Sequence, residues 1–470
     1  MAALVARYCL LMPLSIVSSV LLARWLSVQD FGVFTSVTFL VFGIGSLFEL
    51  GLISVLIQQP EPPTVAEQRT VFTVYLAFFA VLALLLMLSA PWLALVFRLP
   101  NDGSSLLRWM TLPMLLGALG SVPTVMLERS LRFGSLAAVE VSSTFLEKLV
   151  TLVLAYQGFG FWSFLWGTLA AVGLRMSLLN ICSPWSFGLA WDGGVLRHRM
   201  AQGMWFQGVN LAHMARENLH TLVAGPTCGP HAVGLLNWST NLATLVPANA
   251  LMLAHRVTFT AYARLQHDHS EAGAVLRATL RRLWLFTAPP MSCLWVLADP
   301  LVRFVYGEVW LEALPVLFWA LIRAWAGQLF SPLLVFINAR GQAALGFRFI
   351  LASTLLEWTL AMAFLAFMGY RGLAVGAALG SIGPAIVMAV YVNRTASLKP
   401  IATLAPGLAL ASGLVAVSLL MAPLVTSWQT LLGAIMILAL LWVLVVGFLE
   451  RCLIVDVWAR LRGRFLRNAA

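Results

Sequence analysis

Two copies of one short motif place carboxylates inside long apolar stretches of the sequence. The pentapeptide STFLE at 143–147 returns 210 residues later as STLLE at 353–357. An intramembrane carboxylate is costly, and it usually faces a charged partner or a water-filled cavity. Lys148 directly follows Glu147, whereas a tryptophan follows Glu357. We therefore expect a structural ion pair at Glu147. We expect Glu357 to be unpaired and to hold a proton in lipid, which makes it a candidate proton-coupling site.

A polar stripe runs along one predicted helix in the middle of the chain. Asn210, His213, Glu217 and His220 recur at steps of 3, 4 and 3 residues, with Arg216 on the flank of the stripe. These steps place the four residues on one helix face. Such a face should line a cavity rather than contact lipid, and Arg216 could then bind a phosphate bidentately. The alternative is a network of the same residues that only packs the helix bundle.

Four more charged residues lie in or beside apolar stretches. Glu49 could couple ion movement, or it could pair with Arg24 or with a cation of the polar stripe. Arg175 lies near the end of its stretch, where a long side chain commonly reaches the lipid headgroups. Arg323 lies deeper and is, with Arg24 and Lys148, a further candidate for binding an anion.

Patterns for other chemistries are weak or missing in the sequence. His267 and His269 are two residues apart in a predicted loop without further ligands, so we expect a solvated loop and no metal. No Gly-rich phosphate loop of the Walker type is present, and no Ser/His/Asp nucleophile pattern stands out. We therefore expect no catalytic residues, no cofactor and no enzymatic activity, with proton or sodium coupling as the open possibility.

The composition predicts a membrane protein. Of 470 residues, 61% are hydrophobic and only 10% are charged, whereas a soluble chain is about 45–50% apolar and about 25% charged. The formal net charge of +11 would suggest nucleic acid in a soluble chain. Here it fits cytoplasmic loops, which collect positive charge, so we expect membrane lipids and no nucleic acid as partners.

The apolar runs predict an all-α polytopic protein with about fourteen membrane-spanning helices, because about 20 apolar residues cross the bilayer. The predicted spans are 3–23, 33–57, 71–97, 106–127, 136–157, 160–182, 201–223, 232–254, 279–298, 313–337, 347–368, 372–392, 403–425 and 430–449. With both termini inside, twenty Arg and Lys residues fall in the inner loops and tails and five in the outer loops. This asymmetry predicts cytoplasmic termini.

The repeated pentapeptide belongs to a wider predicted duplication. Pro123 corresponds to Pro332 at an offset of 209 residues, and the segment 31–34 corresponds weakly to 233–236 at an offset of 202. Slowly drifting offsets predict two six-helix repeats that run the same way through the membrane. We expect an N-terminal lobe at 1–200, a C-terminal lobe at 201–397, two further helices at 398–450, and a basic cytoplasmic tail at 451–470.

Several segments resemble the opening and the second half of a known family. The resemblance rests on residues 21–26 (LLARWL), 30–34 (DFGVF), 49–52 (ELGL), 158–162 (GFGFW), 216–219 (RENL), 306–310 (YGEVW) and 338–341 (NARG). Together they resemble the Wzx-type oligosaccharide flippases, the polysaccharide-export branch of the multidrug/oligosaccharidyl-lipid/polysaccharide superfamily. The resemblance covers the chain from about residue 4 to residue 395.

This resemblance implies two six-helix lobes around a central cavity and a multi-pass place in the bacterial inner membrane. The implied cargo is a polyprenyl-pyrophosphate-linked oligosaccharide for O-antigen, capsule or exopolysaccharide, moved to the outer leaflet by alternating access. Implied partners are the polymerase and glycosyltransferases of the same pathway. A drug antiporter of the related efflux type, a membrane glycosyltransferase or polymerase, and a non-transporting scaffold are the alternatives. An Arg-rich cavity disfavours the first of these, and the lack of a sizeable extramembrane segment disfavours the second.

Overall fold

The computed structural model describes residues 2–43, 45, 56, 63–193, 214, 216–264 and 269–450. These residues contain helices and connecting turns but no β-strand. They fall into two compact units, one formed by 1–238 with 365–373 and the other by 239–364 with 374–470. The predicted all-α architecture is therefore confirmed.

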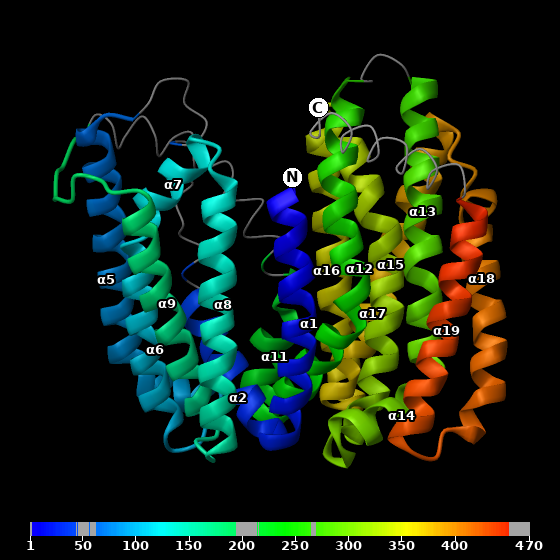
Figure 1. The fold of residues 1–470 in the computed structure, drawn as a ribbon, viewed down its shortest axis with the longest axis horizontal. Helices are drawn as coiled ribbons and strands as arrows, with labels where there is room; N and C mark the ends of the chain where they lie inside the picture. The colour runs from blue at the N-terminus through cyan, green and yellow to red at the C-terminus, as the bar shows by residue number, and fades with distance from the viewer. Residues whose placement is uncertain are drawn as a thin grey trace, which may run out of the picture. The chain divides into compact units, whose positions relative to one another are not determined.

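The first unit contains eight helices and the beginning of a ninth among its described residues (Figure 1). They are α1 (Ala2–Trp25), α2 (Val28–Thr38), α5 (Val65–Val96), α6 (Gly103–Ala118), α7 (Ser121–Arg129), α8 (Phe133–Tyr156), α9 (Trp162–Cys182), α11 (Leu219–Cys228) and the first turns of α12 (Pro230–Arg264). A π-helical turn, Phe39–Gly43, continues α2. Within this unit α8 packs along both α1 and α9, and α6 packs along α5 and α9.

The second unit contains the rest of α12 and the helices that follow it (Figure 1). They are α13 (His269–Val296), α14 (Ala298–Leu301), α15 (Leu314–Ala339), α16 (Ala343–Met368), α17 (Tyr370–Ala396), α18 (Pro400–Met421) and α19 (Trp428–Leu449). Short helical turns at Val302–Tyr306, Glu308–Ala313 and Ala422–Leu424 join some of them. Here α13 packs mainly against α18 and also against α15 and α19.

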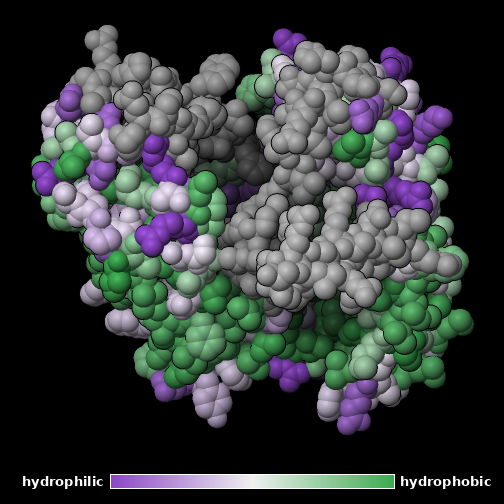
Figure 2. Space-filling model, turned by 45° about the horizontal axis from the view of Figure 1, so that its top comes forward, coloured by the Kyte–Doolittle hydropathy of each residue, from purple (hydrophilic) through white to green (hydrophobic). Residues whose placement is uncertain are grey.

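Eight helices of the described part are long and apolar enough to cross a membrane. A ninth is added if the pair Glu271–Val296 and Ala298–Tyr306, bent by 79°, counts as one span. Each of the fourteen predicted ranges overlaps a helix, but the number fourteen stays a prediction, as do the lobe boundaries. Figure 2 shows hydrophobic side chains over the helix sides and hydrophilic ones gathered towards the helix ends, as lipid contact requires.

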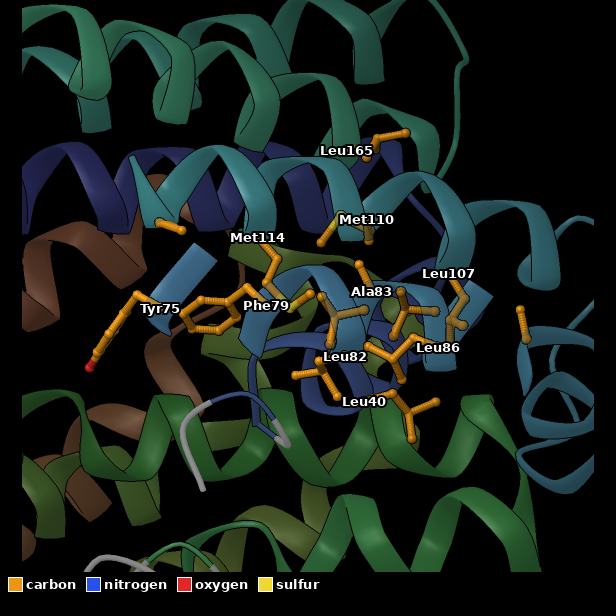
Figure 3. Packing of buried hydrophobic residues seen from close by; sticks show 14 of the residues in the cluster. Leu40, Tyr75, Phe79, Leu82, Ala83, Leu86, Leu107, Met110, Met114 and Leu165 are labelled. Atoms are coloured by element: carbon orange, nitrogen blue, oxygen red, sulfur yellow. The ribbon is translucent and has the colours of Figure 1, made fainter. Parts of the chain in front are cut away.

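The core of the first unit lies between α2, α5 and α6 (Figure 3). On α5, Tyr75, Phe79, Leu82 and Leu86 follow one another at steps of 4, 3 and 4 residues, so they share one helix face. They pack against the α6 side chains, among which Met110 is fully buried. This tightly packed face holds α2 in place from one side.

The other side of α2 crosses the start of α12 at two glycines. A Cβ atom on Gly32 would collide with the carbonyl oxygen of Pro230, and a Cβ atom on Gly234 would collide with the carbonyl oxygen of Val28. The backbones therefore touch, which only glycine permits. Beside them, Asn237 donates a 2.8 Å hydrogen bond from Nδ2 to Oγ1 of Thr35.

A side-chain cap fixes where α2 begins. Asp30 lies three residues after Ser27, and its carboxylate accepts hydrogen bonds from the Ser27 amide at 3.0 Å and the Ser27 hydroxyl at 2.7 Å. The Asp30 amide donates in turn to the Ser27 hydroxyl, which completes a capping box. The cap sets the helix register that turns Gly32 towards α12.

The glycine crossing predicts a large effect of the smallest substitution. Gly32→Ala should lower the thermal unfolding midpoint in detergent, because overpacking of this kind costs about 1–3 kcal/mol. Gly413→Ala is the matched control, since a Cβ atom there meets nothing within 4 Å. Equal midpoints for the two variants would show that the crossing does not depend on glycine.

Candidate functional site

A buried ion pair joins α15 to α16 in the second unit. Nη2 and Nε of Arg323 lie 3.2 and 3.3 Å from Oε2 of Glu357. The hydroxyl of Ser353, one turn earlier on α16, donates to the other carboxylate oxygen at 3.1 Å. The Glu357 side chain is 0% exposed and that of Arg323 is 13% exposed. Both carboxylate oxygens therefore have polar partners inside the helix bundle, as a buried charge requires.

The close approach of α17 buries this carboxylate. Gly376 and Gly380 are four residues apart on α17. A Cβ atom on Gly376 would collide with the backbone of Ala361, and a Cβ atom on Gly380 would lie 2.6 Å from Cα of Glu357. Small residues at this spacing let membrane helices pack backbone to backbone. The second pentapeptide is thus covered by α17, with Arg323 as its charged neighbour.

The expectation that Glu357 lacks a cationic partner is wrong. Its partner comes from 34 residues earlier in the chain and from the preceding helix. The local sequence, in which a tryptophan follows the glutamate, could not reveal it. The usable signal was a single arginine in the predicted span 313–337 and a single glutamate in the next one, 347–368. Opposite charges deep in neighbouring membrane helices commonly pair.

The first pentapeptide forms the ion pair that its sequence predicted. Nζ of Lys148 lies 2.9 Å from Oε1 of Glu147 on α8, and the two side chains are 26% and 34% exposed. Gly167 of α9 packs against this turn: a Cβ atom there would lie 2.9 Å from the carbonyl oxygen of Glu147 and would collide with Thr151. A glycine of the following helix therefore approaches the backbone of each pentapeptide glutamate.

The structure describes only part of the predicted polar stripe. Asn210 and His213 lie outside the described residues, as does Glu49 of the earlier segment. Glu217 is exposed at the start of α11, Arg216 is half-buried, and His220 is buried. The role of the stripe as a cavity wall stays a prediction.

Arg24 stands apart from the two ion pairs. It is exposed in the last turn of α1, next to Trp25, whose ring packs edge-on against that of Tyr156 at 5.4 Å. Its place at a helix end agrees with a residue near the membrane surface, and its predicted role in anion binding stays a prediction.

The second unit contains a buried polar side chain, Gln328, that the sequence did not indicate as a candidate. Gln328 is 1% exposed on α15; its Oε1 accepts a 2.5 Å hydrogen bond from the Thr287 hydroxyl on α13. Its Nε2 donates to Sδ of Met291 at 2.8 Å. One turn further along α15, Ser331 lies 3.2 Å from Nε2 of His255. An uncharged glutamine among apolar residues gives a weaker signal than a charge, which explains the omission.

Metal ligation finds no support in the described ranges, where no group of three His, Cys, Asp or Glu side chains could hold an ion. His267, one of the two histidines considered for such a site, lies outside those ranges.

A double-mutant cycle tests the buried ion pair. Glu357→Leu leaves the Arg323 charge buried without its partner, so the unfolding free energy in mixed detergent micelles should fall by about 3–5 kcal/mol. Arg323→Met together with Glu357→Leu should recover most of the loss. The control is Arg303→Met, since Arg303 is 42% exposed beside Glu308, and its loss should cost less than about 1 kcal/mol. Additive single and double effects would contradict the pairing.

Comparison with known proteins adds a family and a fold. Residues 21–315 match the family described as Polysaccharide biosynthesis protein. The succinoglycan biosynthesis transport protein ExoT of Rhizobium meliloti (strain 1021) is 28% identical over 312 residues, 65% of this chain and 61% of ExoT. The lipopolysaccharide biosynthesis protein WzxC of Escherichia coli (strain K12) is 22% identical over 353 residues, 74% of this chain and 70% of WzxC. The match thus spans about three-fifths of the length of ExoT.

The fold is that of known membrane transporters. The inward closed conformation of the lipid II flippase MurJ superposes with a TM-score of 0.71 at 14% identity, covering 94% of this chain and 97% of MurJ. An inward-facing multidrug resistance transporter of the MATE family gives 0.60 at 15% identity, covering 81% and 94%. These identities support a shared fold and nothing finer. Since the family match extends over well more than half of the sequence, the chain belongs to the polysaccharide biosynthesis protein family.

Proposed function

We propose that this chain is a flippase that moves a polyprenyl-pyrophosphate-linked oligosaccharide from the cytoplasmic to the outer leaflet. The observation that carries the proposal is the family match over residues 21–315 on a fold shared with the lipid II flippase MurJ. ExoT is named as a transport protein of succinoglycan biosynthesis, and WzxC as a protein of lipopolysaccharide biosynthesis. A secondary transporter for a lipid-linked glycan agrees both with the names of these two relatives and with the shared fold.

The proposed mechanism is alternating access of two six-helix repeats. Support comes from the α2–α12 crossing, where contacts come in equivalent pairs at one offset of 202 residues. Gly32 contacts Pro230, and Gly234 contacts Val28. Gly32 and Gly234 are 202 residues apart, and so are Val28 and Pro230. The hydrogen bond between Thr35 and Asn237 spans the same 202 residues. Such reciprocal contacts are what a twofold axis between duplicated halves produces.

We propose, from the arginine distribution, that this crossing lies on the outer side of the membrane. Residues 24–32 and the first residue of α12, Pro230, both fall in predicted outer segments. We propose that the crossing closes the outer side while the cargo is loaded from the cytoplasm, and that it separates when the cargo leaves. Both chain termini lie in the cytoplasm in this arrangement, and the protein resides in the bacterial inner membrane.

The charged residues divide into binding and coupling roles in this proposal. Arg216 leads the binding of the pyrophosphate, with Arg24 and Lys148, while Asn210, His213 and His220 offer hydrogen bonds to phosphate or sugar. Glu49 and Glu217 remain candidates for ion coupling.

Arg323 and Glu357 share one role because they pair with each other. A proton on Glu357 would remove the attraction that holds Arg323, so the pair could respond to a proton gradient. Arg323 could bind an anionic cargo only while released from Glu357, which links coupling to binding.

Reconstitution tests the proposed function directly. Purified protein in proteoliposomes should move a fluorescent polyprenyl-pyrophosphate-linked glycan between leaflets under a proton or sodium gradient. A well-folded protein that moves no such lipid under either gradient, but moves cationic drugs instead, would favour the antiporter reading that the MATE-like fold keeps open.

Variants in cells separate transport from a scaffold role. Arg216→Ala and Glu357→Gln should both abolish surface glycan in cells that depend on this chain, because each removes a charge assigned to transport. Protein level in the membrane, measured on the same samples, is the control, and Arg303→Met should leave the glycan unchanged. Surface glycan at the wild-type level in both variants would contradict the transport roles of Arg216 and Glu357.

A further inference from the structure

A cavity of about 450 Å³ lies inside the first unit, between the π-helical turn Phe39–Gly43 and the helices α5, α6, α7 and α9. Its walls are mostly apolar, with the aromatic rings of Phe42, Tyr75 and Phe79 and the thioethers of Met114 and Met176. Figure 3 shows Tyr75, Phe79 and Met114 close together at one end of the packed core. The volume falls in the usual range of small-molecule sites, about 300–1,000 Å³.

One cation stands in this wall. Among the described residues that line the cavity, Arg175 of α9 is the charged one, and in the described part of the chain its guanidinium has neither an ion pair nor a hydrogen bond. Ser121 and Thr124 also line the cavity, but their hydroxyls donate to the carbonyl oxygens of Ala118 and Gly120. Of these three polar residues, Arg175 therefore offers the donors that no carbonyl oxygen of the chain accepts, and the Tyr75 hydroxyl is a further polar group of the wall.

The cavity has room for a ligand beside that cation. Gly117 lines it in the last turn of α6, and a Cβ atom there would meet nothing within 4 Å. Arg175 itself is exposed, so the charged wall can be reached from outside the packing. An exposed guanidinium at the rim of an apolar cavity can bind the phosphate of a ligand whose apolar part enters the cavity.

The place of the cavity along the helices indicates which leaflet supplies the ligand. Arg175 lies seven residues before Cys182, the last residue of α9, which is about 10 Å along the helix. Tyr75 and Thr124 lie similarly near the ends of α5 and α7 that the arginine distribution assigns to the cytoplasm. A ligand would thus enter from the cytoplasmic leaflet.

We propose that this cavity binds the phosphorylated end of a prenyl lipid, with Arg175 on the phosphate and the aromatic wall on the first isoprene units. Such a ligand contacts both Arg175 and the aromatic side chains. A free phosphate would make no contact with the aromatic rings, and a neutral lipid would leave Arg175 without an anionic partner. The inference rests on the proposed function and deepens it: the cavity is a cytoplasmic-side loading site for the lipid carrier.

Ligand binding to the purified protein in nanodiscs tests the site without transport. Farnesyl pyrophosphate should bind to the wild type, while farnesol and inorganic pyrophosphate should each bind at least about tenfold more weakly. Arg175→Ala should weaken farnesyl pyrophosphate binding about tenfold or more, and Arg175→Lys should restore part of the loss. Arg348→Ala is the matched control, since Arg348 is an exposed arginine near the cytoplasmic end of α16.

A second variant fills the cavity and leaves the charge in place. Gly117→Leu should abolish farnesyl pyrophosphate binding, whereas Gly413→Leu, also into open space, should not. Binding by Arg175→Ala and Gly117→Leu at the wild-type level would overturn the site and leave Arg175 as a headgroup contact. Inorganic pyrophosphate binding as tightly as farnesyl pyrophosphate would overturn the lipid assignment. Wild-type protein that binds but moves no lipid-linked glycan would contradict the proposed function alone.

Discussion

The backbone contact between α2 and α12 is the constraint around which the first unit is organised. Gly32 and Gly234 leave no room for a side chain, so the two helices meet backbone to backbone. Two features support that contact. The Ser27 cap sets the register of α2, and the packed face of α5 contacts the other side of α2. The helix α12 begins in the first unit and continues into the second.

The glutamates of the two pentapeptides are paired in different ways. At the offset of 209 residues between Pro123 and Pro332, the residue that precedes Arg323 by this distance is Met114. The first unit therefore has no arginine at that place, and Glu147 pairs with its neighbour Lys148 at a partly exposed position. In the second unit the pair is buried and joins two helices, and a change in its charge would act on the packing of both.

The helices were predictable because a membrane requires about 20 apolar residues for each span, a signal that survives without any tertiary information. The Glu147–Lys148 pair was predictable for the same reason, being local. The partner of Glu357 was not, because it depends on how α15 and α16 pack. Nor was the contact of Gly32 with α12, although the weak correspondence of 31–34 with 233–236 contained its offset. If the halves are duplicated as the sequence predicts, residues near the axis between them contact their own counterparts, so that offset was the signal to follow.

Crosslinking across the crossing tests its opening most directly. Thr35→Cys and Asn237→Cys, introduced after replacing the five native cysteines by serine, put thiols where the 2.8 Å hydrogen bond now lies. If the two helices must separate in each cycle, oxidation should stop the movement of lipid-linked glycan in proteoliposomes, and a reductant should restore it. Each single-cysteine variant should be unaffected by oxidation. Full transport by the crosslinked protein would contradict the idea that this contact opens.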